Sequence, residues 1–272
     1  MTQKDPHKRL LAICGKGGSG KTVLAALLTK LFLQTSGIRL LVIDADPTMS
    51  LPGTLGVSVQ KTVSDVRERI IREARTAGDR EKHHLARSLD YMLLEALVET
   101  DRFSLLVMGR PDSLGCYCPV NELLREGIGT LAQHFDVTLI DGEAGVEQIS
   151  RQVIRSVDTP IIVSDISVRG LQTAALIRKV IESHKIIKYR KMGLVLNRVR
   201  GSESALDEYV KQTGLELFGC IPEDETITRF DMQARPLLGI PETAAALNAV
   251  QSILARIDPR YEKGQSPISG TV

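Results

Sequence analysis

The chain of 272 residues has no tryptophan, and aromatic side chains make up only 4% of it. Its four cysteines are too few for a disulfide-stabilised scaffold of this length. No apolar run approaches the roughly 20 residues that a membrane-spanning helix needs, and the N-terminal apolar stretch is shorter than the core of a secretory signal. We therefore expect a cytoplasmic protein without a membrane partner, whose core is built from Leu, Ile, Val and Ala.

An excess of charge of one sign is also missing. Lys and Arg number 35 against 33 Asp and Glu, which leaves a formal net charge of +2. This balance excludes a strongly basic nucleic-acid binder or an acidic disordered tail as the main character of the chain. With 43% hydrophobic and 25% charged residues, the composition is typical of a soluble globular protein, and no nucleic-acid partner is expected.

Short aliphatic runs alternate with longer helix-like segments along the chain. The expected strands are Arg9–Cys14, Arg39–Ile43, Ser104–Met108, Val137–Ile140, Pro160–Val163, Met192–Leu196 and Leu217–Ile221. The expected helices are Lys21–Gln34, Val63–Ala77, His84–Glu99, Val146–Ser156, Gly170–His184, Ala205–Thr213 and Pro241–Ile257. Near-continuous aliphatic strands are typical of a parallel sheet that is covered on both faces. The pattern predicts an α/β fold with a doubly wound, mostly parallel sheet of about seven strands and helices on both faces.

Neither an internal repeat nor a low-complexity linker divides the chain. We expect one domain over residues 1–258 and a loose tail over 259–272, which carries Pro, Gly and Ser. The segment 62–100 fits the pattern least well. Its basic residues Arg67, Arg69, Arg72 and Arg75 alternate with acidic ones, so we expect a solvated helix face there.

The strongest motif is Gly15-Lys16-Gly17-Gly18-Ser19-Gly20-Lys21-Thr22, which fits G-x-x-x-x-G-K-[ST] between a strand and a helix. Glycines let consecutive backbone N–H groups turn toward phosphate oxygens, and the helix N-terminus adds free donors. Lys21 would bring a positive charge to the β- and γ-phosphates, and the Thr22 hydroxyl would ligate Mg²⁺. The motif predicts a phosphate-binding loop for a magnesium nucleoside triphosphate, with Val23 as the next residue of the site.

Acidic residues follow two of the expected strands. Asp44 and Asp46 follow the second strand, although Asp-Pro is also a common turn initiator. Asp141 ends another strand at the Walker B position, where it would hold Mg²⁺ through the water shell of the ion. Gly145, four residues later, would sense the γ-phosphate with its N–H, so that this segment is ordered by triphosphate and released on hydrolysis.

With its additional lysine at Lys16, the loop resembles the deviant Walker A motif of the MinD/ParA/nitrogenase iron protein class. The resemblance implies an ATPase in which Lys16 reaches across a nucleotide-sandwich homodimer to the partner's phosphates. It implies catalytic roles for Lys16, Lys21 and Asp46, with Asp46 orienting the attacking water and Asp44 supporting the metal region.

The same resemblance bears on the nucleotide base. The guanine motif N-K-x-D is missing from the chain. The family reads adenine with an asparagine that ends a strand, and with a second segment that follows the next strand. The resemblance therefore implies that Asn197, Pro222 and Asp224 contact adenine, and it favours ATP over GTP.

Cys116 and Cys118 form a Cys-x-Cys pair. From the spacing alone, unrelated loop cysteines or a redox pair explain it at least as well as metal ligation. Two pairs brought together in a symmetric dimer would supply four thiolates, which suit Zn²⁺ or, in a planar arrangement, Ni²⁺. The segment Arg110–Asn121 resembles that of the CooC-type accessory ATPases, which insert nickel into the active-site cluster of carbon monoxide dehydrogenase. The resemblance implies Ni²⁺ or Zn²⁺ at a dimer interface induced by nucleotide or metal, and a client nickel enzyme.

Three alternatives remain at this level. One Cys-x-Cys pair per chain would also hold a 4Fe–4S cluster between two subunits, as in an iron–sulfur electron-transfer ATPase. A MinD-type positioning regulator would need a basic amphipathic C-terminal helix, and residues 244–258 carry little positive charge. A ParA-type partition protein would bind DNA through basic patches, which nothing in the sequence demands.

Overall fold

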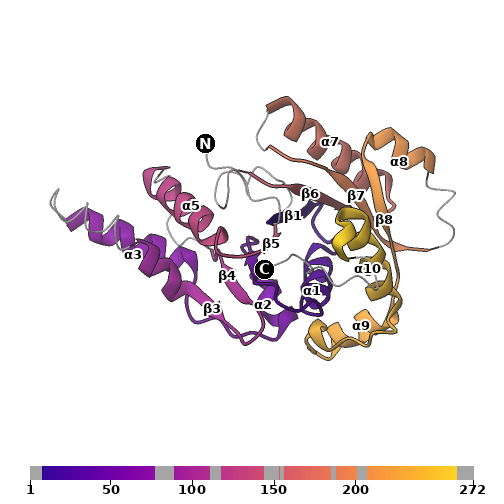
Figure 1. Ribbon diagram of the computed structural model, residues 1–272. Helices are drawn as coiled ribbons and strands as arrows, with labels where there is room; N and C mark the ends of the chain where they lie inside the picture. Colours follow the sequence, from indigo (N-terminus) through magenta and orange to yellow (C-terminus); the bar gives the residue numbers. More distant parts are fainter. Residues whose placement is uncertain are drawn as a thin grey trace, which may run out of the picture.

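The computed structural model describes residues 8–76, 89–110, 118–143, 153, 156–184, 188–200 and 207–261. Its centre is an eight-stranded sheet in the order β3-β4-β2-β5-β1-β6-β7-β8 (Figure 1). The strands are β1 Arg9–Gly15, β2 Leu40–Asp44, β3 Leu97–Glu99, β4 Ser104–Val107, β5 Val137–Asp141, β6 Thr159–Ser164, β7 Gly193–Val199 and β8 Glu216–Pro222. All pairs are parallel except β3 with β4. β1 lies between β5 and β6, with crossovers leading to both sides of it, and in open sheets of this kind a crevice forms at the carboxyl end of such a strand.

The sheet has one strand more than expected. Each of the seven predicted strands is present, with ends shifted by up to three residues. The prediction that a helix continues to Glu99 is wrong, because residues 89–96 are helical and Leu97–Glu99 form β3. A tight turn explains the difference: Thr100 N donates to Phe103 O at 3.0 Å, and Phe103 N donates to Thr100 Oγ1 at 3.0 Å. This turn folds β3 back antiparallel onto β4.

Helices cover both faces of the sheet, as predicted. They are α1 Lys21–Phe32, α2 Ser50–Leu55, α3 Val63–Thr76, α5 Cys118–Ala132, α7 Val168–His184, α8 Asp207–Thr213, α9 Glu225–Met232 and α10 Ala245–Ile257. Helices α2, α5 and α9 were not predicted, and the expected helix Val146–Ser156 falls mainly outside the described residues. Within the part of the chain that the structure describes, no helix has the length and apolar character needed to cross a bilayer.

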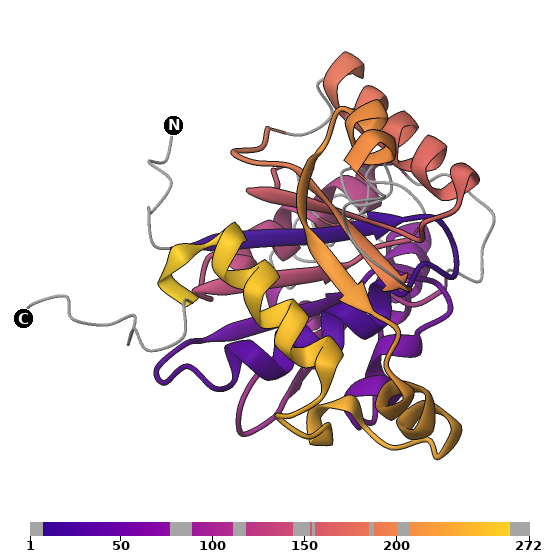
Figure 2. The same ribbon diagram turned by 90° about the vertical axis from the view of Figure 1, so that its right-hand side faces the viewer.

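Two apolar layers sandwich the sheet. Residues 89–96 and helices α3, α5, α7 and α8 pack on one face, whereas α1, α2, α9 and α10 pack on the other (Figures 1 and 2). Along β1, Leu10, Ala12 and Cys14 face the first layer, and Leu11 and Ile13 face the second. The central strands are therefore buried on both faces, which explains their continuous aliphatic sequences.

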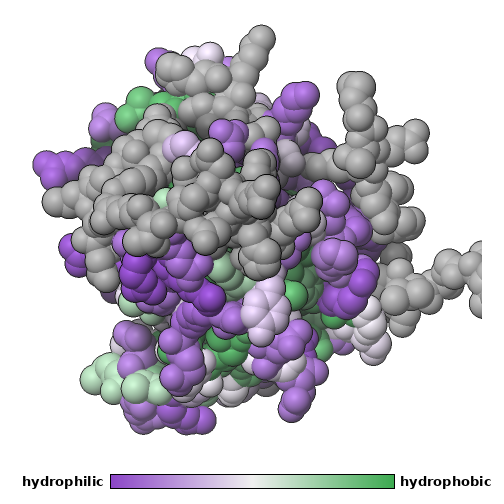
Figure 3. Space-filling view, turned by 90° about the vertical axis from the view of Figure 1, so that its left-hand side faces the viewer, coloured by the Kyte–Doolittle hydropathy of each residue, from purple (hydrophilic) through white to green (hydrophobic). Residues whose placement is uncertain are grey.

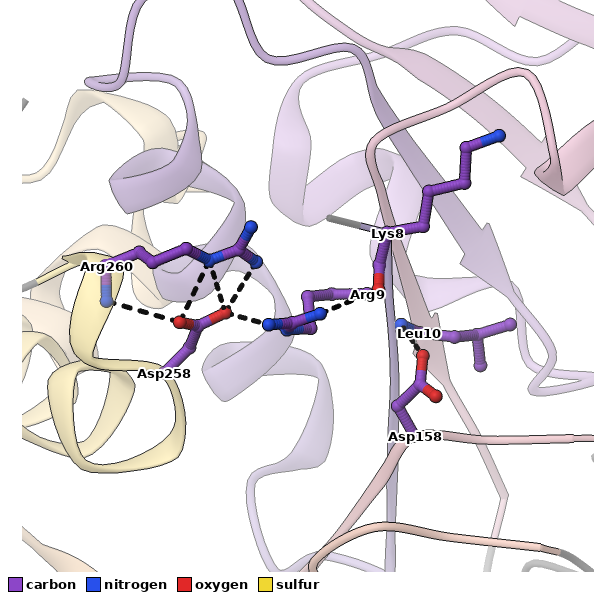
Figure 4. Close-up of polar contacts among 6 residues, drawn as sticks. All are labelled: Lys8, Arg9, Leu10, Asp158, Asp258 and Arg260. Atoms are coloured by element: carbon purple, nitrogen blue, oxygen red, sulfur yellow. Dashed lines mark hydrogen bonds and ion pairs between the residues drawn. The ribbon is translucent and has the colours of Figure 1, made fainter. Parts of the chain in front are cut away.

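The C-terminal end of α10 is fixed by a buried carboxylate. The Asp258 side chain is 7% exposed and accepts hydrogen bonds from Arg9 Nε at 2.9 Å and from Arg260 at 2.6 Å (Figure 4). Pro259–Tyr261 form a 3₁₀ turn, and the Tyr261 ring packs edge-on against Phe32 with centroids 5.1 Å apart. The packed fold thus extends to Tyr261, beyond the boundary expected at 258. The rest of the expected tail, 262–272, lies outside the described residues.

Candidate nucleotide site

The phosphate loop has the backbone that its glycines predict. Gly15 ends β1 with φ +147°, and Gly18 and Gly20 have φ +75° and +95°. A Cβ on Gly15 would lie 2.1 Å from the carbonyl oxygen of Val163 on β6, so no side chain fits there. Around Gly17 and Gly18 the same space is open within 4 Å among the described residues. The loop therefore presents bare backbone at the carboxyl end of β1.

Polar side chains of the loop lie against this backbone. Lys21 opens α1, is 7% exposed, and donates from Nζ to the carbonyl oxygen of Lys16 at 3.4 Å. The same oxygen accepts from Ser19 N at 3.2 Å. The buried Ser19 Oγ has no hydrogen-bond partner among the described residues, an arrangement that costs free energy until a ligand satisfies it. Thr22 and Val23 follow, both half-buried.

Two fully buried carboxylates lie side by side next to the loop. Asp44 on β2 and Asp141 on β5 are register partners, and both are 0% exposed. The Asp44 carboxylate accepts from Asp46 N at 3.0 Å and from Leu51 N at 3.2 Å. Neither carboxylate oxygen of Asp141 makes a hydrogen bond of normal geometry with a described residue, although the Thr22 hydroxyl is near enough to lower its pKa. An acid buried without partners in this way fits a site that a cation completes.

The titration of these acids reflects the same environment. The pKa of Asp141 is raised to about 7, mainly by burial and also by the nearby Asp44, against the lowering effects of the Thr22 hydroxyl and Lys21. Burial also raises the pKa of Asp44 to about 6, although its two backbone hydrogen bonds work in the opposite direction. Both carboxylates are therefore poorly stabilised as anions in the ligand-free chain, which favours exchange of a proton for a metal ion.

Two further predicted catalytic residues lie at the rim of the site. Oδ1 of Asp46 accepts from Thr48 N at 2.9 Å and from Thr48 Oγ1 at 2.8 Å, so the Asp-Pro segment does form a turn. Lys16 is 42% exposed, and its Nζ lies 4.0 Å from Oδ2 of Asp165. The loop, the acidic strand ends and these rim residues all gather at the carboxyl ends of β1, β2, β5 and β6.

Three residues of this region were missed from the sequence. Asp165 directly follows β6, so the signal of an acid after a buried strand was available for it. Ser50 Oγ lies 3.4 Å from Thr22 Oγ1. Arg198 has a left-handed backbone, φ +55°, and its guanidinium donates to the carbonyl oxygen of Gly18. No local sequence signal marks Ser50 or Arg198, because their contacts depend on how distant segments meet.

Asn197, predicted to contact adenine, contacts the phosphate loop in the nucleotide-free chain. Its side chain is 7% exposed, and Nδ2 donates to the carbonyl oxygen of Ser19 at 2.8 Å. A Cβ on Gly20 would lie 2.0 Å from this nitrogen, so the contact requires glycine at position 20. In this ligand-free chain the hydrogen bond from Asn197 therefore connects β7 to the phosphate loop.

Asp224 caps two helices. Its Oδ1 accepts from Thr226 N at 2.8 Å in the first turn of α9, and its Oδ2 accepts from Ala246 N at 2.9 Å at the start of α10. Burial alone would raise the pKa of Asp224, but these hydrogen bonds hold it below its ordinary value. Pro222 ends β8 opposite Val199 and lines a groove of about 450 Å³ between β8 and α10.

Only one of the two predicted cysteine ligands lies among the described residues. Cys118 is the first residue of α5, whereas Cys116 and Gly145 lie outside the described residues. Among the described residues, no group of three or more His, Cys, Asp or Glu side chains is placed to hold a metal ion. Burial raises the pKa of the Cys14 thiol to about 12, which leaves it a small apolar core residue, and Cys220 is half-buried.

The comparisons with known proteins show the family of the chain. The CobQ/CobB/MinD/ParA nucleotide binding domain (CbiA) matches residues 10–237. The chain belongs to this family. It is a P-loop ATPase of the MinD/ParA type that binds ATP. An uncharacterized ATP-binding protein of Methanocaldococcus jannaschii is 40% identical over 91% of this chain and 98% of its own length.

Two further relatives widen the range of this MinD/ParA-type family. The carbon monoxide dehydrogenase accessory protein CooC of Rhodospirillum rubrum is 29% identical over 81% of this chain and 86% of its own length. The septum site-determining protein MinD of Pyrococcus horikoshii, solved with Mg-ADP, aligns over 92% of this chain and 96% of its own with a TM-score of 0.66. At 24% identity, that likeness establishes the fold.

Proposed function

We propose that this ATPase binds Mg-ATP between two copies of the chain and uses the nucleotide cycle to capture and release a metal ion at Cys116 and Cys118 of both copies. We further propose that the ion is nickel, or zinc as a substitute, and that it passes to a nickel enzyme of the carbon monoxide dehydrogenase type. The observation that carries the proposal is a Cys-x-Cys pair in the sequence, whose second cysteine, Cys118, begins α5, in an ATPase related to the CooC accessory protein.

The residues around the loop fit a magnesium nucleotide. The orphaned Ser19 Oγ and the open backbone of Gly17 and Gly18 suit phosphate oxygens, and Lys21 supplies the adjacent positive charge. Thr22 and the unpartnered oxygens of Asp141 are the groups that would hold Mg²⁺, directly and through its water shell. When bound, the ion would neutralise charge that develops on the phosphates.

The rim residues support the hydrolytic step. Both hydrogen bonds from Thr48 use Oδ1 of Asp46, so we assign Oδ2 to the attacking water. The Lys16 side chain is 42% exposed, and among the described residues its ammonium pairs only with the Asp165 carboxylate, 4.0 Å away, so it is available to the phosphates of a second copy. In the proposal Gly145 senses the γ-phosphate, and Asn197, Pro222 and Asp224 remain candidates for the adenine side.

Metal titration tests the proposal. Wild type should bind one Ni²⁺ or Zn²⁺ per two chains in the presence of ATP, and light scattering should show the dimer. The variant Cys116→Ser/Cys118→Ser should lose the metal while keeping ATP hydrolysis, and Cys220→Ser is the matched thiol control. Unchanged metal stoichiometry in the double variant would reject the cysteine site. A broad visible absorption band in anaerobically purified protein would favour the iron–sulfur alternative.

A further inference from the structure

The first turn of α3 is a rigid, capped structure. Thr62 N donates to Oδ2 of Asp65 at 2.7 Å, and Asp65 N donates back to Thr62 Oγ1 at 3.3 Å, which closes a capping box at the helix start. The end of β4 lies directly against this cap. Gly109, two residues beyond β4, has φ +74°, and a Cβ there would lie 2.5 Å from Thr62 Oγ1. The chain that leaves β4 therefore fits closely against the start of α3.

The same turn of α3 makes hydrogen bonds to the residue that follows β4 and to the first turn of α5. Ser64 N and Ser64 Oγ each donate to the carbonyl oxygen of Met108 at 2.9 Å, just after β4. Arg67 Nε donates to Oδ1 of Asn121 at 3.0 Å, in the first turn of α5. Ser64 and Arg67 are three residues apart, which corresponds to roughly 4.5 Å along a helix. One helical turn thus fixes the base of the segment that leads to Cys118.

Arg67 is buried, contrary to the solvated face expected for this helix. It is 8% exposed, and its guanidinium also contacts Glu68 at 2.8 Å. Arg69, on the same helix, has a 38% exposed side chain and pairs with Glu73 at 2.8 Å, as a surface residue does. Helices α3 and α5 pack together (Figure 1), and the coloured part of the surface on this side of the molecule mixes hydrophilic and hydrophobic residues (Figure 3). Arginine is rarely buried unless it is paired. Its burial at this contact therefore fixes the position of α3 relative to α5, which a solvated arginine would not do.

The base of this segment is also linked to the nucleotide site. Met108 N donates to the carbonyl oxygen of Asp44 at 2.8 Å, next to the carboxylate that Asp46 N and Leu51 N hold. Any shift of Asp44 when nucleotide and metal bind therefore reaches Met108 directly. From Met108 the same shift reaches α3 through Ser64.

We infer that α3 couples the nucleotide site to the N-terminus of α5, with Arg67 as the positioning residue that transmits the shift through Asn121. The coupling follows from the contacts described above. What Cys118 binds rests on the proposed function, but the coupling itself does not. The charged segment that begins at α3 thereby has a role in the ATPase cycle beyond covering the sheet.

The alkylation rate of Cys118 tests this inference without any metal. Iodoacetamide modification is followed by peptide mass spectrometry in the full-length protein, with and without Mg-ATP. In wild type the two rates should differ by about fivefold or more, the lower end of typical coupling between sites. Arg67→Ala and Asn121→Ala should each bring the ratio close to one, and the double variant should add nothing further. ATP affinity should change by no more than about the same factor, because coupling between two sites is reciprocal.

The control is Arg69→Ala, which removes a surface arginine from the same helix and should keep the wild-type ratio. If Arg67→Ala does not fold, Asn121→Ala and Arg67→Lys carry the test, since lysine keeps the charge but not the planar donor group. A wild-type ratio of one, or a full ratio in Asn121→Ala, overturns the inference. A wild type that shows the ratio but binds no Ni²⁺ or Zn²⁺ would sink the proposed metal function and leave the coupling in place.

Discussion

Buried carboxylates at the two ends of the central sheet differ in their partners and in the direction of their pKa shifts. At the C-terminal end of α10, Asp258 is paired with Arg9 and Arg260, and its pKa is held below its ordinary value because hydrogen bonds and charge outweigh burial. At the carboxyl end of β5, Asp141 is more deeply buried, has no hydrogen-bond partner in the described chain, and has its pKa raised to about 7. Both residues lie at the end of a regular element.

The difference separates a structural acid from a functional one. A buried charge with partners holds two segments together, and removing either partner lowers the stability of the fold. A buried charge without partners destabilises the ligand-free fold, so its presence indicates a ligand that is absent from it. By this criterion Asp141 and Ser19 fit a ligand site, whereas the paired Asp258 serves the architecture.

The largest expected effect is on hydrolysis. Asp141→Asn should lower ATP hydrolysis by at least about 100-fold, because it removes a preorganised charge from the site of the metal. The unfolding temperature of the nucleotide-free protein should not fall, since the variant no longer buries an unpaired carboxylate. Phosphate release and thermal unfolding measure the two effects. Asp136→Asn, at an exposed ion pair with Arg39, is the control. A variant that hydrolyses ATP normally would remove Asp141 from the site.

The corresponding variant at the other end of the sheet is Asp258→Asn. It leaves Arg9 and Arg260 without their shared partner, so we expect a loss of about 3 kcal/mol in the free energy of unfolding. ATP hydrolysis per folded molecule should be unchanged, because this end of the sheet is opposite to the loop. Urea unfolding measures the loss. A fully stable Asp258→Asn protein would show that the paired acid contributes no more than a surface ion pair.

The same contrast predicts a pH dependence. A carboxyl group whose folded pKa is raised binds its proton more tightly in the folded state, so stability falls as the pH rises through its folded pKa. For Asp44 and Asp141 those values are about 6 and about 7. Between pH 5 and 8 the metal-free protein should lose up to about 4 kcal/mol of stability, the value for two independent groups. Urea unfolding across this range should show a flatter profile for Asp141→Asn.

Asp258→Asn should keep the wild-type slope in that window. Its folded pKa is lowered, so the stability it contributes is present above its unfolded value, 3.8, and is lost as the pH falls through the folded pKa. An equally flat profile in Asp258→Asn would assign the slope to some other group.

Local chemistry was predictable from the sequence, and contacts between distant segments were not. The glycines of the phosphate loop and the acids that follow β2 and β5 each carry their signal within a few residues, and the structure places them together. The turn at Thr100 that creates β3 also had a local basis, but the helical pattern before it masked the signal. The burial of Arg67 depends on Asn121, 54 residues away, and therefore left no mark on the sequence around it.

The smallest expected effect concerns the role of Asn197. If its amide supports the phosphate loop through Ser19, Asn197→Ala should weaken ATP and GTP binding alike, by about threefold to tenfold, the equivalent of one hydrogen bond. If the amide instead reads adenine in the nucleotide complex, ATP binding should weaken while GTP binding stays constant. Titration with fluorescent analogues of both nucleotides distinguishes these outcomes. Asn248→Ala, on α10, is the matched control. A loss confined to ATP would mean that the contact with Ser19 opens when nucleotide binds, so that a residue which is structural in the free chain becomes part of the base pocket.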